Sequence, residues 1–315
     1  MATGEALLTQ IFRNPADTGA RLVYADWLLE RGDARGELIH LQCKELLDAR
    51  EEKRMRGLLR KHAKTWLGPV SGATDVRSRV WDRGFLHYVR LERGHFREIR
   101  EAVGHHEWTT VRTLNAACNA LAIDLICHPV MRELRTVTRL HPDNLSKLAM
   151  RAEPFAIEQL DIIQPDHMPQ GLRTPHWPGL PELRVLSIGA HAPDELAWMQ
   201  TMPIETLIIS YLRGDELQSW LGALDRSPWK VSRFGIGDSD RDEDEVEPSF
   251  AFERDDGGRF TKLTVRCREP WADEGLIGQL VRIPSASVTQ LAIVGGDGER
   301  HAKLRSAASH LLASV

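Results

Sequence analysis

The chain has 315 residues, of which 42% are hydrophobic and 27% charged, and its formal net charge is −4. This composition is typical of a folded domain, and the length suits two ordinary domains or one extended array of repeats. The small net charge excludes a strong overall attraction to nucleic acid or anionic lipid. No apolar run approaches the roughly 18 residues that a membrane span needs, so we expect no membrane segment.

The N-terminus and the cysteines bear on the compartment. Residues 1–14 lack a basic stretch followed by an apolar core, so we expect no signal peptide. The cysteines, Cys43, Cys118, Cys127 and Cys267, form no Cys-x-x-Cys pair and match neither a zinc ribbon nor a disulfide framework. Scattered thiols suit a reducing compartment, and the sequence therefore predicts a cytoplasmic protein.

Helical periodicity, with almost no strand pattern, characterises the first part of the chain. Apolar side chains recur at helical spacing in residues 5–13 and 17–31, again after Asp33, and in residues 50–67. The sequence therefore predicts a helical N-terminal domain over residues 1–72.

One segment of this domain, Arg21 to Gln42, reads RLVYADWLLERGDARGELIHLQ. Its order of aromatic, acidic and glycine positions resembles the signature of the bacterial repeat-companion domain. That family consists of short N-terminal modules in myxobacteria and planctomycetes, typically followed by leucine-rich-repeat-like sequence. The resemblance implies a partner module for repeats and implies no reaction. Asp26, Arg35 and Glu37 are its candidate functional residues, but alternating charges at a tight helical corner more often form a hydrogen-bonded lattice.

The rest of the chain repeats a six-place phrase with apolar residues in places one, four and six, as in Leu183, Leu186 and Ile188. The phrase starts nine times, at positions 86, 111, 134, 157, 183, 204, 231, 260 and 288. Intervals of 21 to 29 residues resemble those of leucine-rich repeats, in which each unit has one strand and one return element. Residues 73–298 are therefore predicted to form a leucine-rich-repeat-like solenoid.

Two features of these repeats refine that prediction. The return helices are expected at residues 95–103, 119–127, 142–150, 192–202, 214–224 and 271–283. The asparagine that normally follows each strand is present only at Asn119, so the curvature should be irregular. The helical pattern over residues 299–315 predicts a helix that caps the open end of the stack. The predicted fold is α/β: a helical cap, an irregular solenoid of parallel strands and return helices, and a C-terminal capping helix.

The outward positions of the strands, which are the third and fifth places of the phrase together with Arg266, make the candidate protein-binding face. It comprises Thr113, Asn115, Gln159, Asp161, Val185, Ser187, Thr206, Ile208, Arg233, Lys262, Thr264, Arg266 and Gln290. These side chains are mixed, mostly small and polar, and include no acid–base pair and no nucleophile–histidine pair. A broad sheet face of this kind suits protein binding. We therefore expect a non-enzymatic interaction protein with a protein partner whose identity the sequence does not give.

Sequence motifs for catalysis or metal binding are absent. The sequence holds no His-Glu-x-x-His, no phosphate-binding Gly-x-x-x-x-Gly-Lys and no Gly-x-Ser-x-Gly. The thirteen histidines show no metal-ligand spacing. We therefore expect no enzyme, no cofactor and no metal, while an effector enzyme whose site is built from distant residues stays an alternative, because fold does not fix function.

Two charged segments suggest other partners. The acidic segment 238–247 alternates carboxylates, but a calcium-binding EF-hand loop would need glycine at Glu243 and glutamate at Ser249. We expect a solvated insertion, with calcium or a basic partner as alternatives. The predicted helix 50–64 carries seven Lys or Arg residues that could contact phosphates, so nucleic-acid association is an alternative function. Aromatic residues do not interleave with them, and the expected role is a solvated helix face.

Overall fold

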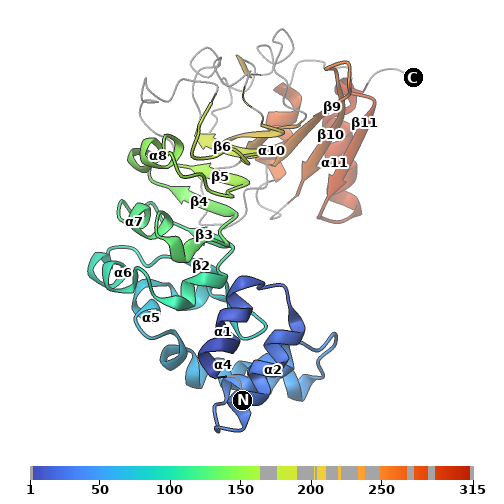
Figure 1. The fold of residues 1–315 in the computed structure, drawn as a ribbon. Coiled ribbons are helices and arrows are strands. Elements are labelled where there is room, and N and C mark those ends of the chain that lie inside the picture. Colours follow the sequence, from blue (N-terminus) through green and yellow to red (C-terminus); the bar gives the residue numbers. More distant parts are fainter. Residues whose placement is uncertain are drawn as a thin grey trace. The chain divides into compact units, whose positions relative to one another are not determined.

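The computed structural model describes residues 3–163, 176–189, 202, 204–210, 219–220, 233–237, 249–267, 273–282 and 288–312. The described chain is a mixed α/β fold (Figure 1) and divides into two compact units, Met1–His141 and Pro142–Val315. The boundary expected between residues 72 and 73 lies inside the first unit, because strands follow the helices there without a break.

The first unit begins with the helices that the sequence predicts. They are α1 (Gly4–Arg13), α2 (Thr18–Leu29), α3 (Arg35–Gln42), α4 (Ala49–Leu67) and the single turn α5 (Val70–Ala73). Thr3, Asp17 and Asp48 each begin a helix, because their side chains accept hydrogen bonds from backbone N–H groups of the first turn.

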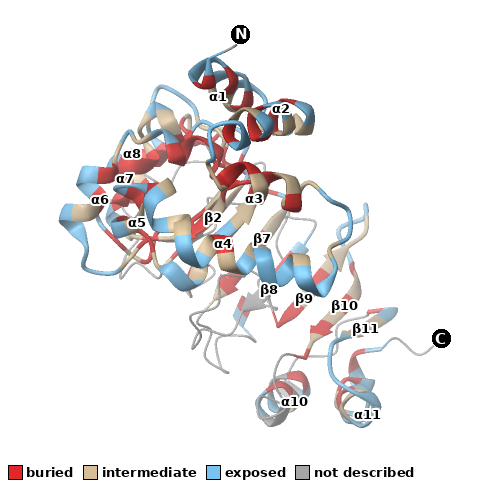
Figure 2. Ribbon diagram, turned by 90° about the horizontal axis from the view of Figure 1, so that it is seen from below, coloured by how far each residue is buried: buried red, intermediate tan, exposed pale blue. Residues whose placement is uncertain are grey.

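One apolar cluster holds α1, α2 and α3 together. Ile11, Tyr24, Leu28, Ile39 and Phe85 are buried in it, and Phe85 comes from the first hairpin of the strand region. By contrast, α4 is exposed along most of its length (Figure 2). The helices therefore pack on the start of the strand region as well as on one another.

The strands of the first unit follow the predicted phrase. They are β2 (Phe85–Arg90), β3 (Thr113–Asn115) and β4 (Thr136–Leu140), preceded by an unpredicted strand β1 (Val80–Asp82). β1 and β2 form an antiparallel hairpin, whereas β2, β3 and β4 are parallel and place the fourth-place residues Val89, Leu114 and Val137 in register. All three side chains are fully buried, so the apolar places of the phrase face the core.

The second unit repeats this arrangement. Four parallel strands are present: β5 (Gln159–Ile162), β6 (Val185–Gly189), β7 (Thr206–Ser210) and β8 (Arg233–Gly237). Their fourth-place residues, Leu160, Leu186, Leu207 and Phe234, are in register and fully buried. The six-place phrase thus fixes the register of both groups of parallel strands.

Strand β9 (Phe250–Arg254) does not belong to the predicted phrase. It pairs antiparallel with both β8 and β10 (Phe260–Arg266), and β10 pairs parallel with β11 (Gln290–Val294). The phrases that start at 231 and 260 are therefore not direct neighbours. Phe250 and Phe252 are buried while Ala251 is only half-buried, an alternation typical of a strand.

The return helices are present where the chain is described. Those of the first unit are α6 (Phe96–Ala102) and α7 (Ala122–Ile126), and those of the second are α8 (Pro142–Ala149) and α10 (Asp273–Arg282). The helix expected over residues 299–315 occurs as α11 (Gly298–Ala307). The helices expected at 192–202 and 214–224 lie almost wholly outside the described residues, as does the acidic segment 238–247. Within the described ranges, no helix has the length and apolar character that a bilayer span requires.

Candidate functional site

The predicted strand face is only partly accessible. Arg233 and Gln290 are exposed. The half-buried residues are Thr113, Gln159, Asp161, Val185, Thr206, Lys262, Thr264 and Arg266. Asn115, Ser187 and Ile208 are buried and contribute no accessible surface. The accessible face is therefore narrower than the sequence predicts.

Asn115 is buried because its side chain serves the backbone. After β3 the chain turns sharply, and Ala117 and Cys118 adopt φ values of 49° and 57°. The Oδ1 atom of Asn115 accepts a hydrogen bond from the Ala117 N–H at 2.8 Å. A side chain that stabilises a positive-φ turn in this way is turned inward, away from a partner.

Charged side chains meet across β8, β9 and β10. Glu253 on β9 lies in register with Arg233 on one side and Lys262 on the other. Lys262 Nζ lies 2.7 Å from Glu253 Oε1. The unpredicted strand β9 therefore supplies a carboxylate that pairs with Lys262, one of the cations expected on the face.

The first hairpin turn is held by a side chain of the segment that carries the helical signature. Arg83 and Gly84 have φ values of 46° and 83°, as in a two-residue type I′ turn. Arg21 Nη1 donates to the carbonyl oxygens of Asp82 and Arg83 at 2.9 and 3.0 Å, and Arg21 Nε donates to Pro15 O at 3.0 Å. Arg21 is therefore committed to three backbone carbonyls, two of them at the hairpin turn.

Three residues of α3 hold the same turn. Arg35 Nε donates to Gly84 O at 2.9 Å. The Gln42 side chain donates to Trp81 O at 3.1 Å and accepts from the Gly84 N–H at 2.7 Å. Ile39 packs so closely on Gly84 that a Cβ there would lie 2.1 Å from Ile39 Cγ1. Arg21, Arg35, Gln42 and Ile39 form what we call the hairpin clamp.

The clamp continues into a buried ion pair. Arg35 donates two parallel hydrogen bonds to Glu107, at 2.6 and 2.8 Å. Burial raises the pKa of Glu107, but the charges of Arg35 and His106 outweigh it and bring the pKa to about 2. Arg35 thus ties α3 to the hairpin turn and to the short helix His106–Thr110 before β3.

The other acids of the segment also have structural partners. Asp26 Oδ1 lies 2.8 Å from His40 Nε2, which joins α2 to α3. Glu37 receives two hydrogen bonds from Arg54, at 2.6 and 2.5 Å, which join α3 to α4. The Arg54 pair lowers the pKa of Glu37. Asp26, Arg35 and Glu37 are hydrogen-bonded, as expected, but Arg35 and Glu37 bond to Glu107 and Arg54 outside the corner and not to its other charges.

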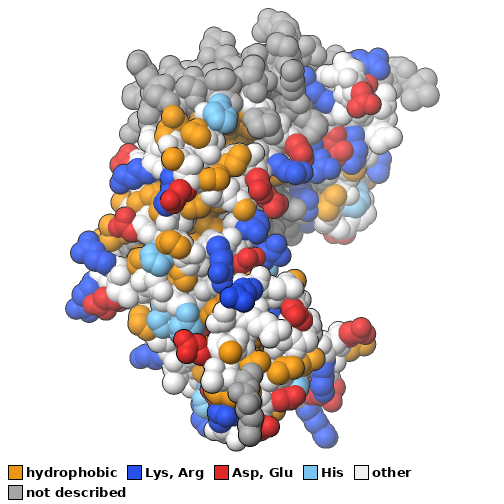
Figure 3. Space-filling model, in the orientation of Figure 1, with side chains coloured by type: hydrophobic (Ala, Val, Ile, Leu, Met, Phe, Trp, Pro, Cys, Tyr) orange, Lys and Arg blue, Asp and Glu red, His pale blue; other side chains and the backbone are white. Residues whose placement is uncertain are grey.

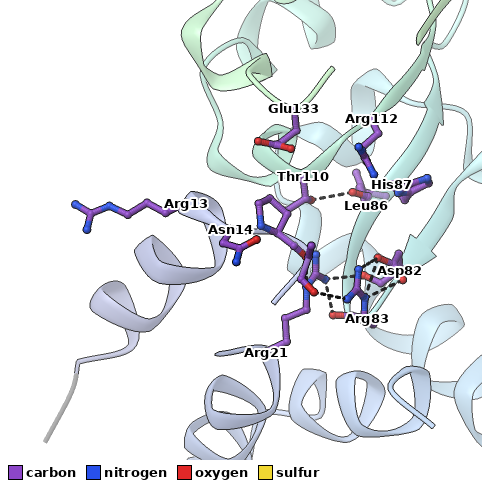
Figure 4. Close-up of a pocket in the computed structure, with 12 residues that line it drawn as sticks. Arg13, Asn14, Arg21, Asp82, Arg83, Leu86, His87, Thr110, Arg112 and Glu133 are labelled. Atoms are coloured by element: carbon purple, nitrogen blue, oxygen red, sulfur yellow. Dashed lines mark hydrogen bonds and ion pairs between the residues drawn. The ribbon is translucent and has the colours of Figure 1, made fainter. Parts of the chain in front are cut away.

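A pocket of about 240 Å³ lies beside the clamp, within the first unit (Figure 4). Its charged and titratable lining includes Arg21, Asp82, Arg83, His87, Arg112 and Glu133. Sequence reasoning missed this site, because these residues come from different repeats and share no motif.

Metal binding finds no support in the described part of the chain, which holds no group of three or more His, Cys, Asp or Glu side chains placed to hold an ion. Comparison of the chain with protein-family models, with curated proteins and with solved structures found no match.

Proposed function

We propose that this chain is a non-enzymatic protein-interaction module of the bacterial cytoplasm. In this proposal an N-terminal helical cap, of the kind that the repeat-companion resemblance implies, precedes an irregular leucine-rich-repeat-like solenoid. The accessible third and fifth places of its strands bind a protein partner. Neither a cofactor nor a metal takes part.

The observation that carries the proposal is the register of the parallel strands. Third-place residues form rows across neighbouring strands: Tyr88, Thr113 and Thr136 in the first unit, and Gln159, Val185, Thr206 and Arg233 in the second. In-register parallel strands with buried fourth places are what stacked repeats produce. Rows of side chains of mixed chemistry favour a protein surface over a small-molecule pocket.

The hairpin clamp supports the role of the helices as a cap. A stack of repeats needs a cap, because its end would otherwise expose the core. Within the first unit, α3 covers the β1–β2 turn through Ile39 and supplies hydrogen bonds from Arg35 and Gln42. Residues of the Arg21–Gln42 segment thus attach the helices to the first hairpin. This role suits a companion module better than a catalytic one.

The test is site-specific photo-crosslinking in the native cell. A photoreactive residue is placed at Arg233 or Gln290, the two exposed positions of the face, and as a matched control at Arg305, which is exposed on α11. We expect one protein adduct from the face positions, competed by excess unlabelled chain, and none from Arg305. Equal labelling at all three positions would refute a specific strand-face interaction.

A second candidate function is association with a nucleic-acid backbone through α4. Lys53, Arg60 and Lys64 are exposed on one side of this helix, at spacings of seven and four residues, and form no side-chain ion pair with the described residues. Such a stripe can contact successive phosphates. A mobility shift that weakens with salt and is lost in a Lys53→Glu, Arg60→Glu, Lys64→Glu variant would support this function, and no binding at low salt would exclude it.

A further inference from the structure

The pocket beside the hairpin clamp is built from four parts of the first unit. They are the end of α1 with the segment that leads to Arg21 on α2, the β1–β2 turn, strand β2, and the residues that precede β3 and β4. Arg132 Nη2 donates to Phe12 O at 2.8 Å, so the end of α1 is held next to the residues before β4. A volume of about 240 Å³ is several times what one buried water needs. The pocket therefore has room for a small ion together with ordered water.

The lining carries an excess of positive charge. The guanidinium groups of Arg21, Arg83 and Arg112 and two carboxylates contribute, which leaves a formal charge of one positive unit with His87 neutral. Asp82 is already paired with Arg83 at 2.8 Å. Arg21 is bound to carbonyl oxygens, which accept its hydrogen bonds without neutralising its charge. Burial, followed by the charge of Arg83, lowers the pKa of Arg21 to about 10.

Two side chains in the pocket are available to a ligand. Arg112 is exposed, and neither Arg112 nor the His87 ring forms a side-chain hydrogen bond or ion pair with any residue that the structure describes. In Figure 4 the Arg112 guanidinium points toward His87, whereas Arg13 extends away from the cavity. Lys and Arg side chains also gather where α1, β2 and β3 lie (Figure 3). The side chains that are free to bind thus lie together in the region of positive charge.

The pKa of His87 depends on the charged groups around it. Burial lowers its pKa, Asp82 acts in the opposite direction, and Arg112, Arg83 and Arg21 lower it further. The ring is therefore neutral at pH 7. A bound anion would offset the three guanidinium charges and raise the pKa of His87, which makes the ring a reporter of occupancy.

We propose that this pocket binds a phosphate-sized oxyanion between Arg112 and His87. Arg83 and Arg21, which also line the pocket, add positive charge. The guanidinium fork matches a tetrahedral oxyanion, and the excess of positive charge favours an anion. Glu133 faces the same cavity and opposes binding, so it limits affinity. This site does not depend on the proposed strand-face function, because none of its four ligand-facing residues belongs to that face.

The test follows the His87 imidazole by NMR during titration with inorganic phosphate, with chloride at equal ionic strength as the blank. We expect phosphate to raise the pKa of His87. Arg112→Gln should weaken binding about tenfold or more, because a charged hydrogen bond is lost, and Glu133→Gln should tighten it. Arg184→Gln is the matched control, since Arg184 is also exposed and holds the same second place of the phrase in the second unit.

O-phosphoserine provides the second arm of the experiment. Binding of both probes supports a site open to free phosphate, and binding of O-phosphoserine alone supports a site for an esterified phosphoryl group. No change in the His87 titration with either probe would overturn the proposal. Equal weakening by Arg112→Gln and Arg184→Gln would overturn it as well, because binding would then reflect overall charge.

Discussion

Arg35 and Glu107 form a bidentate ion pair, with N–O distances of 2.6 and 2.8 Å, in which the side chains are 7% and 1% exposed. The two residues are 72 positions apart, and they join α3 to the helix that precedes β3. Because Arg35 also donates to Gly84 O, one side chain connects the helical segment to the first hairpin and the next repeat. The pair is therefore one of the contacts that attach the helices to the strands.

The ion pair should be costly to break from one side. Glu107→Ala leaves the Arg35 charge buried without a partner, and we expect a loss of about 3–5 kcal/mol of unfolding free energy. Arg35→Met combined with Glu107→Leu should cost less than Glu107→Ala alone, because no uncompensated charge remains. Urea unfolding of each variant, monitored by hydrogen exchange of residues 1–141, measures the two losses of unfolding free energy.

Arg54→Met provides the control for this comparison. It removes the exposed pair with Glu37, whose side chains are 60% and 35% exposed, and should cost at most about 1 kcal/mol. A loss for Glu107→Ala no larger than that of Arg54→Met would show that the buried pair does not hold the unit together.

Stability should also depend on pH through Glu107. Its pKa lies near 2 in the folded chain, against an ordinary value of 4.5. Because the pKa of Glu107 is lower in the folded than in the unfolded chain, its stabilising contribution is complete above the unfolded-chain pKa. That contribution is lost as pH falls from about 4.5 toward 2. The contribution is on the order of 3 kcal/mol. The stability difference between the native chain and Glu107→Gln should therefore be constant above pH 5 and shrink below it; a difference that stays constant to pH 2 would contradict this account.

The contact between Gly84 and Ile39 can be separated from backbone strain. Gly84 and Gly94 both have positive φ, at 83° and 77°, but an added Cβ meets Ile39 at 2.1 Å in the first case and nothing within 4 Å in the second. Both alanine variants lose about 1 kcal/mol from strain. Gly84→Ala should lose about 1–3 kcal/mol more, from overpacking. Equal thermal stability of the two variants would show that α3 does not pack tightly on the turn.

Asn115 should act on stability and not on partner binding. Asn115→Ala leaves the Ala117 N–H buried without its acceptor, which costs about 1–3 kcal/mol. Thr113→Ala, two residues earlier and half-buried, should cost less. Chemical unfolding measures both variants. If Asn115→Ala proved as mild as Thr113→Ala, the buried side chain would not be needed for the turn.

The periodic part of the fold could be predicted from the sequence, because a strand that buries alternate places must repeat apolar residues with a fixed spacing. Leu160, Leu186 and Leu207 lie where the phrase predicts, in register. Strand β9 lies between two copies of the phrase, and its alternating Phe250 and Phe252 do not follow the spacing of the phrase. Contacts between distant residues, such as Arg35 with Glu107, leave no local pattern.

The same reasoning separates the two candidate sites. The residues of the strand face follow from the spacing of the phrase, so they could be named from the sequence. Asn115 is an exception, because its side chain stabilises the positive-φ turn at Ala117 and Cys118. The pocket brings His87 and Arg112 together from consecutive repeats at places that the phrase leaves variable. Only the spatial arrangement of the strands identifies that site.

The most direct measurement of the central claim is the affinity of the crosslinked protein for variants of the strand face. Arg233→Ala and Gln290→Ala remove the two exposed side chains of the face, and Arg305→Ala removes one from α11. Isothermal titration should give a dissociation constant at least about tenfold higher for the Arg233 and Gln290 double variant, because arginine is enriched among the residues that dominate interfaces, and an unchanged constant for Arg305→Ala. Unchanged binding by the double variant, with its fold intact by circular dichroism, would contradict the proposal that this protein binds its partner through the strand face.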